Sequence, residues 1–427
     1  MNAPAVPLWL ASGLRTPFTK ADGPLAHLDD IQLSVPVVQA MARQLASDTG
    51  PDLFVWGGVV PSLRWSNLAR EVLLDSGIGP RIPAFTVVMA CSTSMVGVFA
   101  AAATVGRGNA HLALVGGVDS LSNVQVGVTQ RASNWLRQMA QSRSLKGLLR
   151  MAARTPLREL HLHIPRVANR STGKSMGEHT EDMAKEWKIP RRAQDEIALA
   201  SHRSAVAARD KGFFDSLIMP IAGLKADTIP RADTTLEKLA KLPPVFDTTS
   251  GRGTLSAGNS TGLNDGAAGV WLADEKGLAR LPSDLPRVKL IDWELAAVDI
   301  WHEGLLMAPA YAVPRLLARH GLKYEDIALW EIHEAFAAQV LCHMAAFESR
   351  DYLRNRVGLD FDFGRFPNER MNPNGGSVAI GHPFGATGAR ILSQAVKELA
   401  VMPSGSRAIV SICADGGVGT VTLLETP

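Results

Sequence analysis

Short apolar segments alternate with helical segments along most of this chain, and this alternation limits the folds open to it. The apolar segments are partly β-branched and are joined to the helices by short connections, which is typical of strands in a sheet covered by helices on both faces. The sequence therefore predicts an α/β fold. The expected strands are 6–11, 53–56, 83–90, 111–115, 288–292, 327–330 and those around Ile409 and Val421, and the expected helices are 31–45, 92–104, 310–319, 335–347 and 386–399.

Four residues whose side chains can act as nucleophiles, acids or bases each follow an apolar run, just before a helix or a glycine turn. They are Cys91 before helix 92–104, His333 after strand 327–330, His382 within the glycine-rich segment 375–388, and Cys413 at the start of the glycine-rich turn 414–419. Ligands of open α/β sheets bind at this edge, so we expect the four side chains to gather there.

Cys91 is the candidate nucleophile. A thiol at a helix N-terminus faces unpaired backbone N–H groups and the positive end of the helix dipole, which together favour the thiolate. A lone cysteine between apolar residues is also a common core residue, so position alone leaves both interpretations open.

The three cysteines make an odd number, which argues against a disulfide framework and favours a reducing compartment. Cys342 lies inside an apolar helical pattern and is interpreted as a core residue. No apolar run approaches the length of a membrane span, and the first residues show neither a signal-peptide nor a transit pattern. We expect a cytoplasmic enzyme without a nucleic-acid partner.

The local sequences around the four residues, in this order, resemble the thiolase superfamily. The resemblance runs from about residue 8 to about residue 425. It rests on Gly13-Leu-Arg-Thr-Pro-Phe18, Val88-Met-Ala-Cys-Ser-Thr-Ser-Met95, Gly116-Gly-Val-Asp-Ser-Leu-Ser-Asn123, Ser175-Met-Gly177, Ala257-Gly-Asn-Ser-Thr-Gly-Leu-Asn-Asp-Gly-Ala267, Glu331-Ile-His-Glu-Ala-Phe-Ala337 and Gly381-His-Pro-Phe-Gly-Ala-Thr-Gly388. The histidine before Glu-Ala-Phe is most similar to the 3-ketoacyl-CoA thiolase β subunits of the fatty-acid oxidation trifunctional complex.

The resemblance implies a thiolase fold, in which two pseudo-symmetric halves form a five-layered αβαβα body with an inserted loop domain. The N-terminal half would comprise residues 1–123 and 250–284, the loop domain 124–249 and the C-terminal half 285–427. Within the loop domain, the charged segment 190–209 predicts a helix whose narrow buried stripe consists of Ala193, Ile197, Ala200, Ser204 and Ala208.

The resemblance also implies a reaction, the ping-pong cleavage of 3-oxoacyl-CoA by coenzyme A, reversible as a Claisen condensation. Cys91 would carry the acyl group, His382 would accept its proton, and Cys413, titrating near working pH, would be the second acid or base. His333, directly or through a water, and His382 would donate to the thioester oxygen. The backbone N–H groups of Cys91 and Asp415 would form the other oxyanion hole.

Coenzyme A, acyl-CoA and acetyl-CoA are then substrates, and neither a cofactor nor a metal is expected. By resemblance, Met176 would line the acyl pocket and Thr261 would lie beside the pantetheine arm. An ordinary buried methionine and a turn threonine remain the alternatives for these two residues. The resemblance further implies a homodimer or larger assembly, with an α subunit of hydratase and dehydrogenase activity as a partner.

Asp415 departs from the family pattern, which usually has glycine or alanine at this place. A carboxylate near the reacting thiols would raise their pKa and oppose a developing oxyanion if it pointed inward. We therefore expect the Asp415 side chain to turn away to a partner and only its backbone N–H to serve the site.

Three alternatives remain open. A decarboxylating 3-oxoacyl synthase would use Cys91, His333 and His382 but has no need of Cys413. A zinc site would use all four residues, which lack the paired close spacings of structural zinc sites. A non-catalytic thiolase-like subunit would keep the fold for binding or assembly.

The basic segment 131–170 carries nine Lys or Arg side chains against one acid, Glu159, and without it the net charge of the chain would be negative. Apolar residues recur among these cations close to helical spacing. The pattern predicts a basic amphipathic segment that lies on an anionic membrane surface or on a partner. A solvated helix face that attracts the phosphates of coenzyme A is the alternative.

Overall fold

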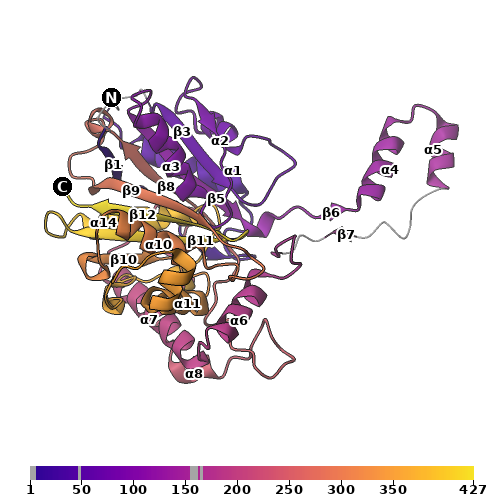
Figure 1. The fold of residues 1–427 in the computed structure, drawn as a ribbon. Coiled ribbons are helices and arrows are strands. Elements are labelled where there is room, and N and C mark those ends of the chain that lie inside the picture. The colour runs from indigo at the N-terminus through magenta and orange to yellow at the C-terminus, as the bar shows by residue number, and fades with distance from the viewer. Residues whose placement is uncertain (1–5, 47–49, 154–161, 164–166) are drawn as a thin grey trace.

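A ten-stranded mixed sheet forms the centre of the molecule in the computed structural model, which describes residues 6–46, 50–153, 162–163 and 167–427 (Figure 1). Its strands run in the order β10-β11-β12-β9-β1-β8-β5-β3-β4, with β2 paired to β8. The strands are β1 (Leu8–Ala11), β2 (Thr19–Lys20), β3 (Leu53–Gly58), β4 (Ala84–Phe85), β5 (Leu112–Ser120), β8 (Asn264–Ala273), β9 (Arg287–Ala297), β10 (Leu329–Ile332), β11 (Arg407–Ala414) and β12 (Val418–Glu425).

The sheet repeats one pairing scheme in its two halves. The N-terminal half runs β3-β5-β8-β1 and the C-terminal half runs β10-β11-β12-β9. In each half the first pair is parallel and the next two pairs are antiparallel. The halves meet where β1 pairs with β9 in antiparallel register. The two pseudo-symmetric halves implied by the resemblance are therefore present as a repeat of topology.

Helices separate and cover the two halves, giving five layers (Figure 1). The helices α3 (Thr93–Val105) and α14 (Thr387–Leu399) pack on each other and on strands of both halves. On the outer face of the N-terminal half lie α1 (Asp30–Ala42) and α2 (Leu68–Ser76), and on that of the C-terminal half lies α10 (Ala308–Arg319) with α11 (Ala337–Glu348) beside it. The predicted αβαβα body is confirmed.

Strand residues alternate between these layers with the period of two that a strand imposes. In β3, Val55 joins the apolar cluster around the central helices, whereas Phe54 and Trp56 join the cluster under α1 and α2. In β11, Val410 faces the central layer and Ile409 faces α10. Both faces of these two strands are thus covered by packed side chains, which is why β3 and most of β11 are apolar.

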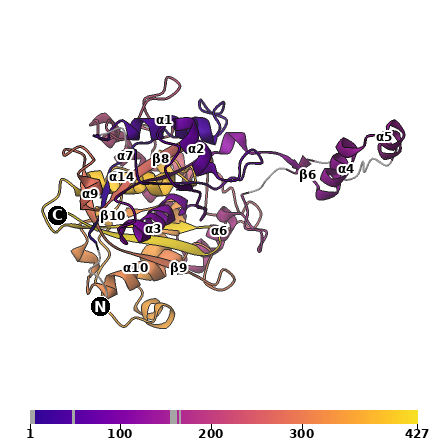
Figure 2. The same cartoon turned by 90° about the horizontal axis from the view of Figure 1, so that it is seen from above.

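The segment inserted between β5 and β8 of the N-terminal half contains α6 (Met176–Glu186), α7 (Arg191–Asp210) and α8 (Leu236–Ala240), which pack against the body. It also contains α4 (Gln130–Gln141) and α5 (Leu145–Ala152), reached through the paired strands β6 (Gly127–Val128) and β7 (Leu162–His163). Figure 2 shows that these two helices, called the α4–α5 hairpin below, project far from the body. Shorter elements are α9 (Glu275–Leu278), α12 (Arg350–Tyr352), α13 (Ser377–Ile380), the 3-10 turns Leu121–Asn123, Tyr324–Asp326 and Asn368–Arg370, and the π turn Leu353–Val357.

Two local expectations differ from the structure. The expected strand over 83–90 shrinks to β4, and the rest of that run is irregular backbone leading to Cys91. The predicted buried stripe of α7 is wrong, because Ala200 is exposed while the buried residues are Gln194, Asp195, Ala198, Leu199, Ser201, His202, Ala205 and Ala208.

The stripe is displaced because α7 turns polar side chains inward to buried partners. Asp195 accepts a hydrogen bond from Asn259 at 3.0 Å, and Ser201 donates one to Glu334 at 2.7 Å. An apolar pattern cannot reveal a face that is buried through hydrogen bonds.

Candidate active site

Cys91 lies at a sharp turn immediately before α3. The preceding Ala90 has a φ of +44°, a left-handed conformation that is rare for residues with a Cβ atom. The Thr93 hydroxyl holds the turn, because it accepts from the backbone N–H of Met89 at 2.9 Å and donates to the carbonyl of Ala90 at 2.8 Å. The thiol is thereby presented at the N-terminal end of the helix, as the sequence predicted.

His382 is oriented to accept a proton from Cys91. Its Nε2 atom lies 3.1 Å from Cys91 Sγ, and its Nδ1 atom lies 2.5 Å from the Thr387 hydroxyl. Because that hydroxyl donates its own proton to the carbonyl of Pro383 at 2.8 Å, it accepts from the ring, so the imidazole proton is on Nδ1. Burial and then the charge of Arg390 lower the pKa of His382 to about 3, which keeps the ring neutral. The lone pair of Nε2 therefore faces the thiol.

The Cys91 thiol is protonated in this arrangement. Burial raises its pKa to about 12, and the negative charge of Asp415 adds to the rise. Hydrogen bonds from the backbone N–H groups of Asp415 and Cys91 oppose the rise without reversing it. We expected the helix N-terminus to favour the thiolate, but burial and the charge of Asp415 outweigh that effect.

Cys413 is the penultimate residue of β11 and lies opposite Gly419 of β12. Burial, and secondarily the charge that Cys91 would carry, raise the pKa of the Cys413 thiol well above its ordinary value. The structure therefore contradicts the expectation that this thiol titrates near working pH. A thiol of this kind keeps its proton until a stronger base forms beside it, which suits a general acid.

His333 follows β10 and packs on His382, with ring centroids 4.2 Å apart. Burial, then the charge of His382, lowers its pKa far enough that the ring is neutral. Its Nδ1 atom lies 2.8 Å from the Ser377 hydroxyl, whereas its buried Nε2 atom has no hydrogen-bond partner among the described residues.

A cavity of about 320 Å³ brings Cys91, His382 and Cys413 together. Met176, the first residue of α6, and Thr261, whose hydroxyl donates to a backbone carbonyl at 3.0 Å, also line it. The rest of its wall is mostly apolar and includes Val167, Phe246, Leu263, Leu306, Phe336 and Phe384. An apolar cavity beside a thiol and its base is suited to an acyl chain.

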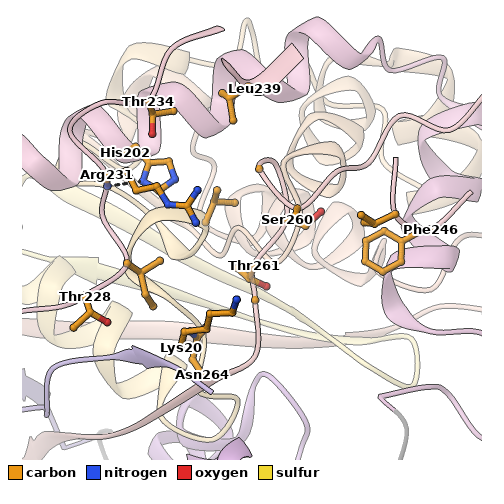
Figure 3. Close-up of a pocket in the computed structure, with 16 residues that line it drawn as sticks. Lys20, His202, Thr228, Arg231, Thr234, Leu239, Phe246, Ser260, Thr261 and Asn264 are labelled. Carbon is orange, nitrogen blue, oxygen red and sulfur yellow. Dashed lines mark hydrogen bonds between the residues drawn. The ribbon is translucent and has the colours of Figure 1, made fainter. Parts of the chain in front are cut away.

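A second cavity, of about 350 Å³, adjoins the first and shares Phe246, Thr261 and Gly262 with it. Figure 3 shows Lys20 and Arg231 on its wall, across from Phe246. Two cations at one end of a cavity suit a phosphorylated ligand.

His202 lies beside Arg231 on the same wall. Its Nδ1 atom accepts from the backbone N–H of Arg231 at 3.2 Å. Burial and then the charge of Arg231 lower the pKa of His202 to about 4, so this ring is a neutral acceptor. The positive charge of the wall therefore comes from Lys20 and Arg231.

The Asp415 side chain turns to a partner, as expected. Its Oδ1 atom accepts from the Asn169 side chain at 2.8 Å and from the backbone N–H of Gly416 at 2.6 Å. The carboxylate is thus held by hydrogen bonds, although its charge still acts on Cys91.

Cys91, His333 and His382 each offer one donor atom, and these atoms lie within 4.8 Å of one another. Two of these groups already contact each other, since the Cys91 thiol faces His382 Nε2. A zinc site built from all four residues is not assembled here. In the described part of the chain, only Cys91, His333 and His382 lie close enough together to share a metal ion, and Cys413 is not in this group. The absence of a metal requirement stays a prediction.

Sequence reasoning missed the residues that orient the two histidines. Ser377 and Thr387 lie inside the glycine-rich segment 375–388 that contains His382, but the sequence pattern did not indicate a function for either. Asn264, which accepts from the backbone N–H of His382 at 2.8 Å, and Arg390 come from β8 and α14. Only their contacts in three dimensions identify them.

Comparison with known proteins agrees with this geometry. The family profile "Thiolase, N-terminal domain" matches residues 8–276, and "Thiolase, C-terminal domain" matches residues 285–426. The chain is 36% identical over 423 residues to a 3-ketoacyl-CoA thiolase of Yersinia enterocolitica, covering 97% of this chain and 96% of that protein. It is 35% identical over 424 residues to one of Colwellia psychrerythraea, covering 98% and 96%.

Two solved structures share the fold over essentially their whole length. The Acat5 thiolase from Ascaris suum in complex with coenzyme A is 26% identical, with a TM-score of 0.79, covering 99% of this chain and 100% of that one. The acetyl-CoA acetyltransferase of Bacillus anthracis is 27% identical, with a TM-score of 0.77 and full coverage of both chains.

Proposed function

The chain belongs to the thiolase family, and on this premise we propose that it is a 3-ketoacyl-CoA thiolase that forms its acyl-enzyme on Cys91. Its activity is that of an acyl-CoA:acetyl-CoA C-acyltransferase. The observation that carries the residue assignment is the meeting of Cys91, His382 and Cys413 in one cavity.

In the first half-reaction, Cys91 passes its proton to His382 Nε2, and its sulfur attacks the 3-oxo carbon of the substrate. The backbone N–H groups of Cys91 and Asp415 stabilise the oxyanion that forms. When the carbonyl reforms, the bond between C2 and C3 breaks and its electron pair becomes the enolate of acetyl-CoA. Cys413 then protonates C2, acetyl-CoA leaves, and the acyl group remains on Cys91.

In the second half-reaction, a molecule of coenzyme A gives its thiol proton to the Cys413 thiolate and attacks the acyl-enzyme. The tetrahedral intermediate collapses to acyl-CoA and a Cys91 thiolate, which recovers its proton from His382. Both cysteines end each cycle protonated, in agreement with the raised pKa of each thiol.

Coenzyme A occupies the cavity of Figure 3 in this proposal. Lys20 and Arg231 bind its phosphates, and the pantetheine arm passes Thr261 into the catalytic cavity, because the two cavities meet at this residue. The acyl chain lies beside Met176. The metabolic setting that follows is fatty-acid β-oxidation.

The α4–α5 hairpin binds an anionic membrane surface. Its cations Arg131, Arg137, Arg143, Lys146 and Arg150 are exposed, and residues 130–153 include no acid. Between these cations, the side chains of Leu145 and Leu149 are 79% and 67% exposed. Exposed leucines among cations are typical of helices that lie in a membrane interface.

The alternative that this hairpin attracts the phosphates of coenzyme A is not favoured, because no residue of 130–153 lines either of the two cavities described above. None of the described helices is long and apolar enough to cross a membrane. Of the basic segment 131–170, residues 154–161 and 164–166 lie outside the described residues.

The remaining expectations keep the status of predictions: a homodimer or larger assembly, an α subunit as a partner, a cytoplasmic location and the residue boundaries of the three domains. A decarboxylating synthase is not favoured, because Cys413 lines the same cavity as Cys91.

Thiolysis tests the proposed function directly. Wild-type protein is mixed with acetoacetyl-CoA or a longer 3-oxoacyl-CoA and coenzyme A, and loss of the enolate absorbance is followed. We expect Cys91→Ala to abolish turnover and the matched control Cys342→Ala to retain it. A protein that instead condenses malonyl-CoA with release of carbon dioxide would be a synthase, and one that does neither would be a non-catalytic subunit.

A further inference from the structure

The hydroxyl of Ser377, the first residue of α13, lies between two buried side chains. Arg390 Nη2 donates to it at 2.6 Å, and His333 Nδ1 lies 2.8 Å away. All three residues are no more than 2% exposed. Among the described residues these are the only hydrogen-bond partners of this hydroxyl.

The chemistry of these groups fixes where each proton lies. A guanidinium has donors and no acceptor, so the Ser377 oxygen accepts from Arg390. The proton of the hydroxyl then has one acceptor within reach, His333 Nδ1. A neutral imidazole carries a single N–H, so the proton of His333 is on Nε2.

His382 has the opposite tautomer. Its Nδ1 atom donates to Thr387, so its free lone pair is on Nε2. The two stacked rings therefore have different abilities, since His382 accepts a proton and His333 donates a hydrogen bond. In each ring, the hydroxyl that faces Nδ1 determines which nitrogen carries the proton.

We propose that Ser377 and Arg390 are positioning residues that lock His333 with its proton on Nε2, making it a hydrogen-bond donor to the thioester oxygen of the acetyl-CoA unit and not a base. The buried Nε2 atom has no partner among the described residues, so its donor is unused until a ligand arrives. A ring nitrogen of His333 lies within 4.8 Å of Cys91 Sγ, close to where bonds change.

Arg390 also keeps the His333 ring from gaining a second proton. Burial, then the charge of His382 and then that of Arg390, lower the pKa of His333. Burial lowers the pKa of Arg390 to about 10, and the acidic side chains of Glu331 and Glu334 oppose this fall, so the buried guanidinium keeps its charge at neutral pH. One buried cation thus orients Ser377 and disfavours the imidazolium.

The inference rests on the proposed function and separates its two chemical steps. His333 would stabilise the enolate oxygen of acetyl-CoA and keep its own proton throughout. Acyl transfer to Cys91 forms a different oxyanion, which faces the backbone N–H groups of Cys91 and Asp415. Weakening the Ser377 contact should therefore impair enolate formation and spare acyl transfer.

Nuclear magnetic resonance tests the tautomer without any activity. Wild-type protein labelled with ¹⁵N-histidine is recorded at neutral pH, and the His333 signals are assigned by their loss in His333→Gln. We expect a directly bonded proton on Nε2 and an unprotonated Nδ1. The reverse pattern, or a doubly protonated ring, would overturn the inference even if the protein is an active thiolase.

A half-reaction comparison tests the consequence. In Ser377→Ala, deuterium exchange from solvent into the methyl group of acetyl-CoA should fall about 10-fold, less than the roughly 100-fold loss expected for removing a whole oxyanion donor. Transfer of the acetyl group from acetyl-CoA to labelled coenzyme A should change less than about 2-fold. Equal losses in both reactions would indicate a merely structural role, and unchanged exchange would show that Ser377 does not matter.

Ser411→Ala is the matched control, because the Ser411 hydroxyl is buried and has no partner among the described residues. It should leave both half-reactions unchanged. Wild-type protein that neither exchanges protons nor transfers acetyl groups would contradict the proposed function, and the tautomer measurement would then decide the inference alone.

Discussion

Asn169 and Asp415 lie 246 residues apart in the sequence and share a hydrogen bond of 2.8 Å between the Asn169 amide and a carboxylate oxygen of Asp415. The contact joins the inserted loop region to the turn that follows Cys413. Together with the backbone N–H of Gly416, the Asn169 amide holds this carboxylate in place. The charge of Asp415 nevertheless still raises the pKa of Cys91.

Asp415→Asn should lower the pKa of the Cys91 thiol, because it removes a negative charge without removing the backbone N–H. We expect a shift of up to about one unit, which corresponds to about 1.4 kcal/mol. The rate of Cys91 alkylation by iodoacetamide, measured against pH, should rise at a given pH, and thiolysis should stay the same or increase. Asp75→Asn, at an exposed position, is the control. A large loss of thiolysis in a folded Asp415→Asn protein would show that the carboxylate has a chemical role.

Cys91→Ala should abolish turnover and leave the fold intact, since the cysteine sits at a cavity wall. Cys91→Ser should retain at most a trace, because an alkoxide requires far more activation than a thiolate. Mass spectrometry of wild-type protein incubated with acyl-CoA should find the acyl group on Cys91. An adduct on Cys342 or Cys413 would refute the assignment.

Cys413→Ala should still form the acyl-enzyme but should not exchange the α-protons of acetyl-CoA. His382→Ala should impair both steps, because this ring accepts the proton of Cys91 and also lies beside the reacting centre. Solvent deuterium incorporation and the yield of acyl-enzyme separate the two variants. Normal exchange in Cys413→Ala would assign the second acid or base to another group.

Replacing Arg143, Lys146, Arg150 and Arg154 by Gln should weaken binding to vesicles that contain anionic lipid, without raising the Michaelis constant for coenzyme A. The binding should be sensitive to salt, since exposed charges are screened beyond about 8 Å at physiological ionic strength. Co-sedimentation with anionic and neutral vesicles measures it. Unchanged vesicle binding together with weaker use of coenzyme A would place the segment in the substrate site.

Asp30→Asn should make the stability of the protein depend less on pH between about pH 4 and about pH 8. Burial and then the charge of Asp119 raise the pKa of Asp30 to about 8, far above the value of a carboxyl group in an unfolded chain. The folded state therefore holds a proton that the unfolded state loses, so the free energy of unfolding falls as pH rises from about 4 to about 8.

The amide keeps an oxygen that can accept from the backbone N–H of Ser120, which now bonds to Asp30 at 2.8 Å. We expect the loss of stability between pH 5 and pH 8 to be smaller in Asp30→Asn by at least about 1 kcal/mol. Urea unfolding at several pH values measures it, with Asp75→Asn again as control. An unchanged slope would mean that Asp30 is ionised in the folded protein.

Much of the site was readable in the sequence because its signals are local. The Cys91 turn depends on a strand-like run followed by a small-residue helix, and the Cys413 turn depends on consecutive glycines, so both could be found from neighbours along the chain. The same holds for most helices and strands, whose bounds differ from the expected ones by a few residues. The prediction of the buried stripe on α7 was wrong because part of its buried face consists of polar residues held by hydrogen bonds, which do not produce a periodic pattern of apolar residues.

The sequence by itself determined the alternation of strands and helices and the four residues that approach one sheet edge, because periodicity and turn chemistry act between residues close in the chain. Only the tertiary structure decided what those residues can do. Burial keeps both thiols protonated, Asn169 restrains Asp415, and two hydroxyls, Thr387 and Ser377, give the paired histidines opposite tautomers. These properties depend on desolvation and on the direction of individual donors, which arise when distant segments meet and are not written in any local pattern.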